Sequence, residues 1–116
     1  MRPVHELGLC EGIVAAVERR AAGRRVARVR VRVGTLHRVV APALDQAFAL
    51  VAEGTVAEGA ALDLVVEPVR ASCAACGEER QVDEPPPACP ACGAPDPAWS
   101  GGDQLVLESI QLLAPA

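Results

Sequence analysis

The chain has 116 residues, enough for one ordinary domain or for a small domain that carries a smaller module. Hydrophobic residues make up 51% of it, but Phe48 and Trp99 are its only aromatic residues, so aliphatic side chains must build the core. The net charge of -4, with eleven arginines and no lysine, excludes an overall basic field that would attract nucleic acid or an anionic membrane surface. No apolar run reaches the roughly 18 residues that span a bilayer, and we expect a cytoplasmic protein.

The first predicted element is an amphipathic helix over residues 9–22. Its apolar residues recur at steps of three and four and therefore share one helical face. They are Cys10, Ile13, Val14, Val17 and Ala21. Gly23 follows where a helix usually ends, because glycine adopts the left-handed cap conformation without steric penalty. Cys10 is expected to be a small buried residue on the apolar face.

Residues 25–34 form the next predicted element, in which Val26 and Ala27 are followed by alternating arginines and valines over residues 28–33. A period of two is typical of a strand. The valines are expected to pack against a helix, and the arginines to face water. A surface for anions or nucleic acid is the alternative for the arginine row. A loop follows with Thr35, Leu36 and His37, and His37 is interpreted as a surface histidine.

Pro42 predicts the first turn of a second helix, which ends at Gly54. Residues 61–69 alternate as a second strand. Residues 105–113 form a predicted third strand, whose apolar phase changes near Ser109 and indicates a bulge or a buried stretch. The expected fold is therefore α+β, with two helices and a small mixed three-stranded sheet.

Residues 72–102 differ in composition from the rest of the chain. They contain four cysteines, six prolines, several glycines and almost no core-forming residues. Apolar burial cannot offset the ordering entropy of such a segment, so we expect a bound metal to hold it. Two domains are predicted: an α/β domain of residues 1–70 and 103–116, and an inserted zinc ribbon of residues 71–102.

The four cysteines form two copies of one motif, Cys73-Ala-Ala-Cys76-Gly and Cys89-Pro-Ala-Cys92-Gly. The spacing points both sulfurs of a pair at one ion, and the glycine relieves the tight turn. Four thiolates fill a tetrahedral site and leave no open position, so these cysteines are predicted to bind a structural zinc ion. A thiol oxidoreductase is the alternative, but its C-x-x-C pair is usually single and opens a helix.

The other candidate residues are weaker when taken singly. From residue chemistry alone, His5 is interpreted as a solvated side chain, and Glu6 as a first-turn acid that interacts favourably with the helix dipole. The sequence contains neither a glycine-rich phosphate loop nor a Ser, His and acid set at a recognisable spacing. We therefore do not expect an enzyme.

Several segments together resemble the HypA/HybF family, the nickel metallochaperones of hydrogenase maturation. They are His5-Glu6-Leu7, the helix after it, the strand ending Arg30-Val31-Arg32-Val33-Gly34, the two C-x-x-C motifs, and Gly102-Asp103-Gln104-Leu105 through Ser109-Ile110. The resemblance covers nearly the whole chain in the same order. It implies a nickel-binding α/β domain with a zinc-ribbon insertion, which agrees with the layout above.

The resemblance also implies where nickel binds. In that family nickel is held by the terminal amine, backbone amide nitrogens and the imidazole of a Met-His-Glu start, which places the nickel site at His5 and Glu6, with Ni(II) as transferred cargo. His37 has a nickel role only as an alternative. This sequence departs from the pattern because residues 1–4 precede His5. We hypothesise that Val4 is the first residue, since a valine codon can serve as a start codon.

The partners implied are a hydrogenase maturation GTPase and the large subunit of a nickel-iron hydrogenase, with urease as an alternative acceptor. We expect no nucleic acid or membrane as partner, and a monomer or weak homodimer. The alternative function is that of a zinc-ribbon module, either one that binds nucleic acid or a regulatory one. Against nucleic-acid binding, residues 72–102 contain Arg80 as their only basic residue.

Overall fold

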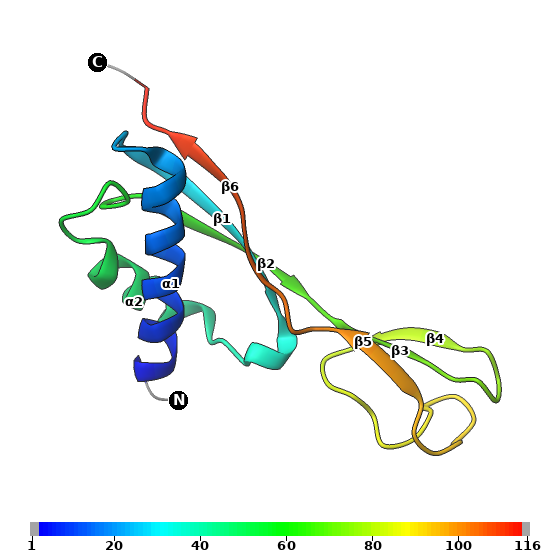
Figure 1. Ribbon diagram of the computed structural model, residues 1–116. Helices are drawn as coiled ribbons and strands as arrows, with labels where there is room; N and C mark the ends of the chain where they lie inside the picture. Colours follow the sequence, from blue (N-terminus) through cyan, green and yellow to red (C-terminus); the bar gives the residue numbers. More distant parts are fainter. Residues whose placement is uncertain (1–2, 115–116) are drawn as a thin grey trace. The chain divides into compact units, whose positions relative to one another are not determined.

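The computed structural model describes residues 3–114, which form two α-helices, one short 3-10 helix and six strands (Figure 1). In chain order they are α1 (Pro3–Ala21), β1 (Val26–Gly34), η1 (Thr35–His37), α2 (Ala41–Ala52), β2 (Ala61–Glu67), β3 (Val69–Ser72), β4 (Glu79–Val82), β5 (Ala98–Gly101) and β6 (Leu105–Leu112). The strands make two sheets, ordered β2-β1-β6 and β4-β3-β5. No helix in this described part is long and apolar enough to cross a membrane.

The chain divides into two compact units. The helical unit contains the described residues up to 32, residues 39–65 and those from 106 onward. The ribbon unit contains residues 33–38 and 66–105. Residues 33–38 belong with the ribbon because their backbone pairs with it: the N–H of Gly34 donates to the carbonyl of Gln104, and that of Leu36 to the carbonyl of Gly102, both at 2.8 Å.

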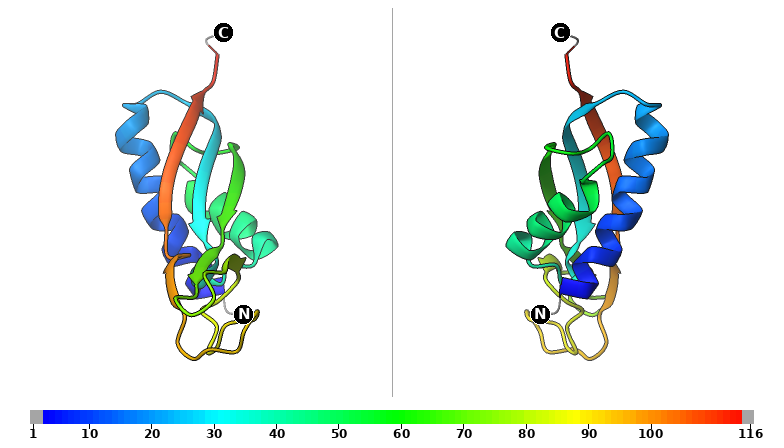
Figure 2. Two further views of the ribbon diagram at one scale, coloured as in Figure 1. Left: turned by 90° about the vertical axis from the view of Figure 1, so that its right-hand side faces the viewer. Right: turned by 90° about the vertical axis from the view of Figure 1, so that its left-hand side faces the viewer.

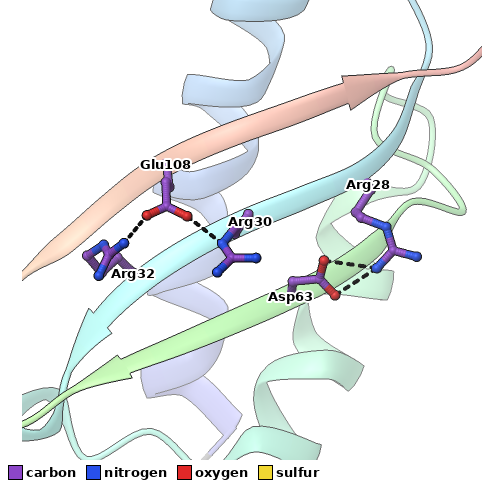
Figure 3. A network of polar contacts seen from close by, with 5 residues as sticks. All are labelled: Arg28, Arg30, Arg32, Asp63 and Glu108. Carbon is purple, nitrogen blue, oxygen red and sulfur yellow. Dashed lines mark hydrogen bonds and ion pairs between the residues drawn. The ribbon is translucent and has the colours of Figure 1, made fainter.

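In the helical unit, α1 and α2 cover one face of the sheet (Figure 2). The predicted alternation of β1 is confirmed over residues 28–33, because Val29, Val31 and Val33 are buried whereas the arginines between them are more exposed. Figure 3 shows β1 and β2 running in the same direction and β6 against them, so the three-stranded sheet is mixed, as expected. The core of this unit comprises Cys10, Ile13, Val14, Val17, Ala21, Val26, Val29, Val31, Leu44, Ala47, Phe48, Ala52 and Ala57.

The prediction for α1 was wrong at its start. The helix begins at Pro3 and not near Leu9, and its first turn therefore includes His5 and Glu6. Proline suits the first helical position, where its missing N–H has no intrahelical acceptor to lose. The end is as predicted, because the helix stops at Ala21 and Gly23 has a φ of 86°.

The predicted strand over residues 61–69 is divided in the structure. β2 ends at Glu67, and Val69 already begins β3, which belongs to the other sheet. Pro68 lies between them and has no N–H to donate to a sheet ladder. The predicted phase change in the last strand is confirmed, since Leu107 packs on the core before it and Ile110 and Leu112 after it.

The arginines on the exposed face of the sheet are engaged by acids of the same chain (Figure 3). One terminal nitrogen of Arg28 lies 2.8 and 2.9 Å from the two carboxylate oxygens of Asp63. Arg30 and Arg32 both form ion pairs with Glu108 of β6. This pairing favours the solvated-face interpretation over a surface for anions or nucleic acid.

Candidate metal centres

The first C-x-x-C motif forms a turn directly after β3. The N–H of Gly77 donates to the carbonyl of Cys73 at 2.8 Å, and the N–H of Cys73 donates to the carbonyl of Glu78 at 2.9 Å. Gly77 has a φ of 76°, a conformation that glycine adopts without strain. The turn is closed on both sides of the motif, which fixes where Cys73 and Cys76 stand.

The second motif repeats this turn. The N–H of Gly93 donates to the carbonyl of Cys89 and the N–H of Cys89 donates to the carbonyl of Ala94, both at 2.8 Å. Gly93 has a φ of 81°, as the position requires. The N–H of Ala91 also points at the Cys89 sulfur, at 3.4 Å. The sequence repeat is therefore a structural repeat.

The two turns bring the four sulfurs together. The Sγ atoms of Cys73 and Cys92 are 3.6 Å apart, those of Cys76 and Cys89 are 3.7 Å apart, and all four lie within 4.8 Å of one another. A tetrahedral zinc site with Zn–S bonds of about 2.3 Å places its sulfurs about 3.8 Å apart. All four cysteines are free of disulfides. The cluster thus fits a structural zinc ion with four thiolate ligands.

The cluster also resists full ionisation without a cation. The N–H groups of Cys92 and Ala91 stabilise the Cys89 thiolate and lower its pKa to about 6. For Cys76 the N–H of Glu78 lowers the pKa, but desolvation and the other three sulfurs outweigh it and raise the pKa to about 12. A divalent cation among the sulfurs, such as zinc, would favour the thiolate form of these cysteines.

The N-terminal turn of α1 presents its two candidate residues in opposite ways. The side chain of His5 is exposed. The side chain of Glu6 is 0% exposed, and its Oε2 accepts a hydrogen bond from the N–H of Val40 at 3.4 Å, while Oε1 has no hydrogen-bond partner among the described residues. Sequence reasoning treated Glu6 as a first-turn acid and missed its burial. Glu6 lies four residues before Cys10, so it extends the apolar stripe by one turn, and this spacing was the available signal.

Two further residues have structural positions. His37 is part of η1 in the ribbon unit, and its Nε2 lies 2.9 Å from the carbonyl oxygen of Asp103. Cys10 is fully buried, as expected, and its Sγ donates to the carbonyl of Leu44 at 3.6 Å. Burial, with the nearby charges of Glu6 and Asp45, raises the pKa of Cys10 to about 11. The thiol of Cys10 is therefore a core group and lies outside the four-cysteine cluster.

The comparisons with known proteins agree with this layout. A family model described as hydrogenase/urease nickel incorporation, metallochaperone, hypA, matches residues 4–112. The hydrogenase maturation factor HypA of Rhodobacter capsulatus is 35% identical over 113 residues, covering 95% of this chain and 100% of the relative. That of Alkalilimnicola ehrlichii is 38% identical over 112 residues, covering 94% and 99%.

Solved structures show the same fold. The solution structure of the Ni metallochaperone HypA from Helicobacter pylori matches with a TM-score of 0.62 and 23% identity, over 95% of this chain and 98% of that one. A second solution structure, of a HypA protein, matches with a TM-score of 0.65 and 24% identity. Since the family model and the relatives each cover nearly the whole chain, the protein belongs to the HypA family of nickel metallochaperones that serve hydrogenase maturation.

Proposed function

We propose that this protein takes up Ni(II) at the first turn of α1, through His5 and the backbone beside Glu6, and delivers it to the large subunit of a nickel-iron hydrogenase. The observation that carries the proposal is the exposed imidazole of His5 in the first helical turn, on a chain of the nickel-incorporation family. An exposed site suits delivery, because the acceptor must reach the ion in order to take it.

The helix start supports the donor set. In an α-helix the first four N–H groups have no acceptor within the helix, and α1 begins at Pro3. The amide nitrogens of residues 4–6 lie in this turn, so a metal that replaces their protons breaks no intrahelical hydrogen bond. Imidazole and amide nitrogens are donors suited to square-planar Ni(II). These donors must lose their protons to bind, so the proposed nickel affinity falls in acid.

A terminal amine directly before His5 would add a further nitrogen to this set. We therefore propose that a chain whose first residue directly precedes His5 binds nickel more tightly than the full chain. Support comes from the family model, whose match begins at residue 4. The amine adds a chelate ring that adjoins the one formed by the imidazole, which holds the same ion at little additional entropic cost.

The zinc ion proposed at Cys73, Cys76, Cys89 and Cys92 has a different task. Four thiolates close the coordination shell, so the ion stays in place and orders the two turns. Glu6 and His5 belong to the helical unit, whereas the four cysteines belong to the ribbon unit. The proposed division of labour follows the two units: exchangeable nickel in the first and resident zinc in the second.

The proposed setting is the cytoplasm, with a monomer or weak homodimer that works together with a maturation GTPase. The curated relatives are named hydrogenase maturation factors, and the family model names urease as well. Hydrogenase is therefore the acceptor we propose. The chain itself is proposed to catalyse no reaction, because its task is binding and release.

The test is a titration of Ni(II) into zinc-loaded protein, in which calorimetry and absorption spectroscopy measure the binding. Two forms are compared, the full chain and a chain whose first residue directly precedes His5. In each form His5→Ala is the test variant. His37→Ala is the matched control, because His37 is the only other histidine and lies in the ribbon unit.

We expect about one nickel per chain in the shorter form, lost in His5→Ala and retained in His37→Ala, with weaker binding in the full chain. Equal binding by both forms would remove the terminal amine from the ligand set. Loss of nickel in His37→Ala with retention in His5→Ala would overturn the proposed site.

A further inference from the structure

The carboxylate of Glu6 is the one buried charged side chain among the described residues, and it stands next to the proposed nickel ligand His5. Successive residues of an α-helix point about 100° apart, so a residue beside an exposed one can face the core. A buried carboxylate is unfavourable unless donors or positive partial charges meet it. For Glu6, which lies on α1, the donor is found at the start of α2.

The N-terminal end of α2 lacks a cap of its own. Its N-cap residue Val40 makes no side-chain capping hydrogen bond, and the first turn contains no acidic residue. Pro42 removes one N–H from that turn, but the others stay without intrahelical acceptors. Oε2 of Glu6 accepts from the N–H of Val40 at 3.4 Å. A helix N-terminus carries partial positive charge and favours an anion there.

The surrounding contacts place this carboxylate firmly between the two helices. Cys10, one turn after Glu6, donates from its Sγ to the carbonyl of Leu44 in the first turns of α2. Leu44 is itself 1% exposed and donates from its N–H to the carbonyl of Val40 at 2.9 Å. Glu6 and Cys10 together therefore join one face of α1 to the beginning of α2.

We propose that Glu6 is a positioning residue of the nickel site, whose buried carboxylate caps α2 from α1 and thereby holds the turn that carries His5. This inference rests on the proposed function and deepens it. The carboxylate does not ligate nickel, because it faces the helix interface whereas the imidazole faces solvent. A second consequence is coupling between the two helices: a structural change at His5 is transmitted to the N-terminal end of α2 through the side chain of Glu6.

The experiment compares Glu6→Ala and Glu6→Gln in the zinc-loaded full chain, with Glu11→Gln as the matched control. Glu11 is an exposed acid of the same helix. The first readout is hydrogen exchange at the amides of Val40, Ala41 and Ala43 without nickel. The second is nickel affinity, and the third is the absorption spectrum of the bound nickel, which reports its donor set.

We expect Glu6→Ala to speed amide exchange at the start of α2 and to lower nickel affinity about tenfold, the usual order of effect when a supporting residue outside the ligand shell is removed. The nickel spectrum should stay unchanged at saturation. Glu6→Gln keeps an oxygen acceptor and should rescue both effects in part, and it also carries the test if Glu6→Ala does not fold. Glu11→Gln should leave all three readouts as in the wild type.

Unchanged exchange at Val40, Ala41 and Ala43 in Glu6→Ala would overturn the proposal. A changed nickel spectrum in Glu6→Gln would also overturn it, because it would make the carboxylate a direct ligand. Failure of the proposed nickel site shows differently: His5→Ala would then leave nickel binding intact, while the exchange measurement still decides whether Glu6 holds α2.

Discussion

Gly34 and Gly102 lie so close together that a Cβ atom on Gly34 would stand 2.0 Å from the carbonyl carbon and oxygen of Gly102. The approach is fixed by the backbone hydrogen bonds from Gly34 to Gln104 and from Leu36 to Gly102. Gly102 itself has a φ of 80°, and a Cβ there would lie 2.5 Å from a methyl group of Val69. Glycine is therefore required at both positions. Gly34 is the last residue of β1, directly before η1, and Gly102 lies between β5 and β6.

Gly34→Ala should destabilise the protein by about 3 kcal/mol or more, because the added methyl meets main-chain atoms that cannot rotate away. Gly12→Ala is the control, since Gly12 is an exposed residue inside α1 with open space around it. That change should stabilise the protein by roughly 0.5–1 kcal/mol through helix propensity. Urea unfolding of both variants measures the pair, and a neutral Gly34→Ala would contradict the close approach.

Removal of zinc by a strong chelator should unfold the ribbon turns and leave the helices in place. The turns of residues 73–77 and 89–93 have few core residues of their own. Their folded state is instead stabilised by the binding free energy of a structural zinc ion, about 10 kcal/mol or more. Amide exchange within the two turns and circular dichroism of the helices measure the two parts separately.

Cys10→Ala is the control for that measurement and should retain one zinc ion per chain, because Cys10 lies in the helical core outside the cluster. A ribbon that keeps its exchange protection after zinc is removed would instead support the thiol oxidoreductase interpretation.

Zinc binding should release protons, more of them at neutral than at alkaline pH. At pH 7 the Cys89 thiol, with its pKa of about 6, is already largely ionised, whereas the raised pKa values of Cys76 and Cys92 keep those thiols protonated. Each of those two thiols must lose its proton to bind, so about two protons or more should leave per zinc ion. Calorimetry in buffers of different ionisation enthalpy counts them, and a value near zero would contradict the four-thiolate site.

The ion pairs of Glu108 should make stability depend on pH in the acid range. The hydrogen bond from Arg32, together with Arg30, holds the pKa of Glu108 below its usual value. A lowered folded-state pKa means that the contribution is complete above the ordinary carboxyl pKa of about 4 and is lost as the pH falls through the folded value. Glu108→Gln should therefore unfold more easily than the wild type near neutral pH, with a difference that shrinks in acid.

Denaturant unfolding followed by the circular dichroism of the helices measures this difference across the pH range. Glu18→Gln is the control, because Glu18 is an exposed acid on α1. A difference for Glu108→Gln that stays constant from neutral to acid pH would contradict the assignment.

The periodicity of the sequence predicted those elements whose apolar residues face the core. The valines of β1 and the apolar face of α2 are examples, and in both the pattern and the burial agree. The start of α1 escaped prediction because its core-facing residue is Glu6, and a carboxylate there depends on the distant Val40. The spacing of Glu6 and Cys10 places Glu6 on the apolar face, but apolar spacing does not identify Val40 as its partner.

The apolar periodicity of the sequence could not predict the strands of the ribbon unit either. β4 and β5 have little apolar alternation, and they exist because both pair with β3 and because the cysteine turns close beside them. The cysteine cluster itself was predictable, since the spacing of thiolates around an ion is set by coordination geometry rather than by tertiary context. The pairing of Arg30 and Arg32 with Glu108 joins segments far apart in sequence, which no local pattern encodes.

In the register of the ribbon sheet, Val69 pairs with Gly101, so the chain enters and leaves the ribbon at neighbouring positions. When the ribbon is unfolded, β2 and β6 are joined by a flexible loop of roughly 40 residues, and closing such a loop costs about 3 kcal/mol of chain entropy. A folded ribbon has already brought its two ends together before β6 adds to β1. Zinc binding at the four cysteines should thus lower the entropic cost of adding β6 to β1, and loss of the metal should weaken the docking of β6 by connectivity alone.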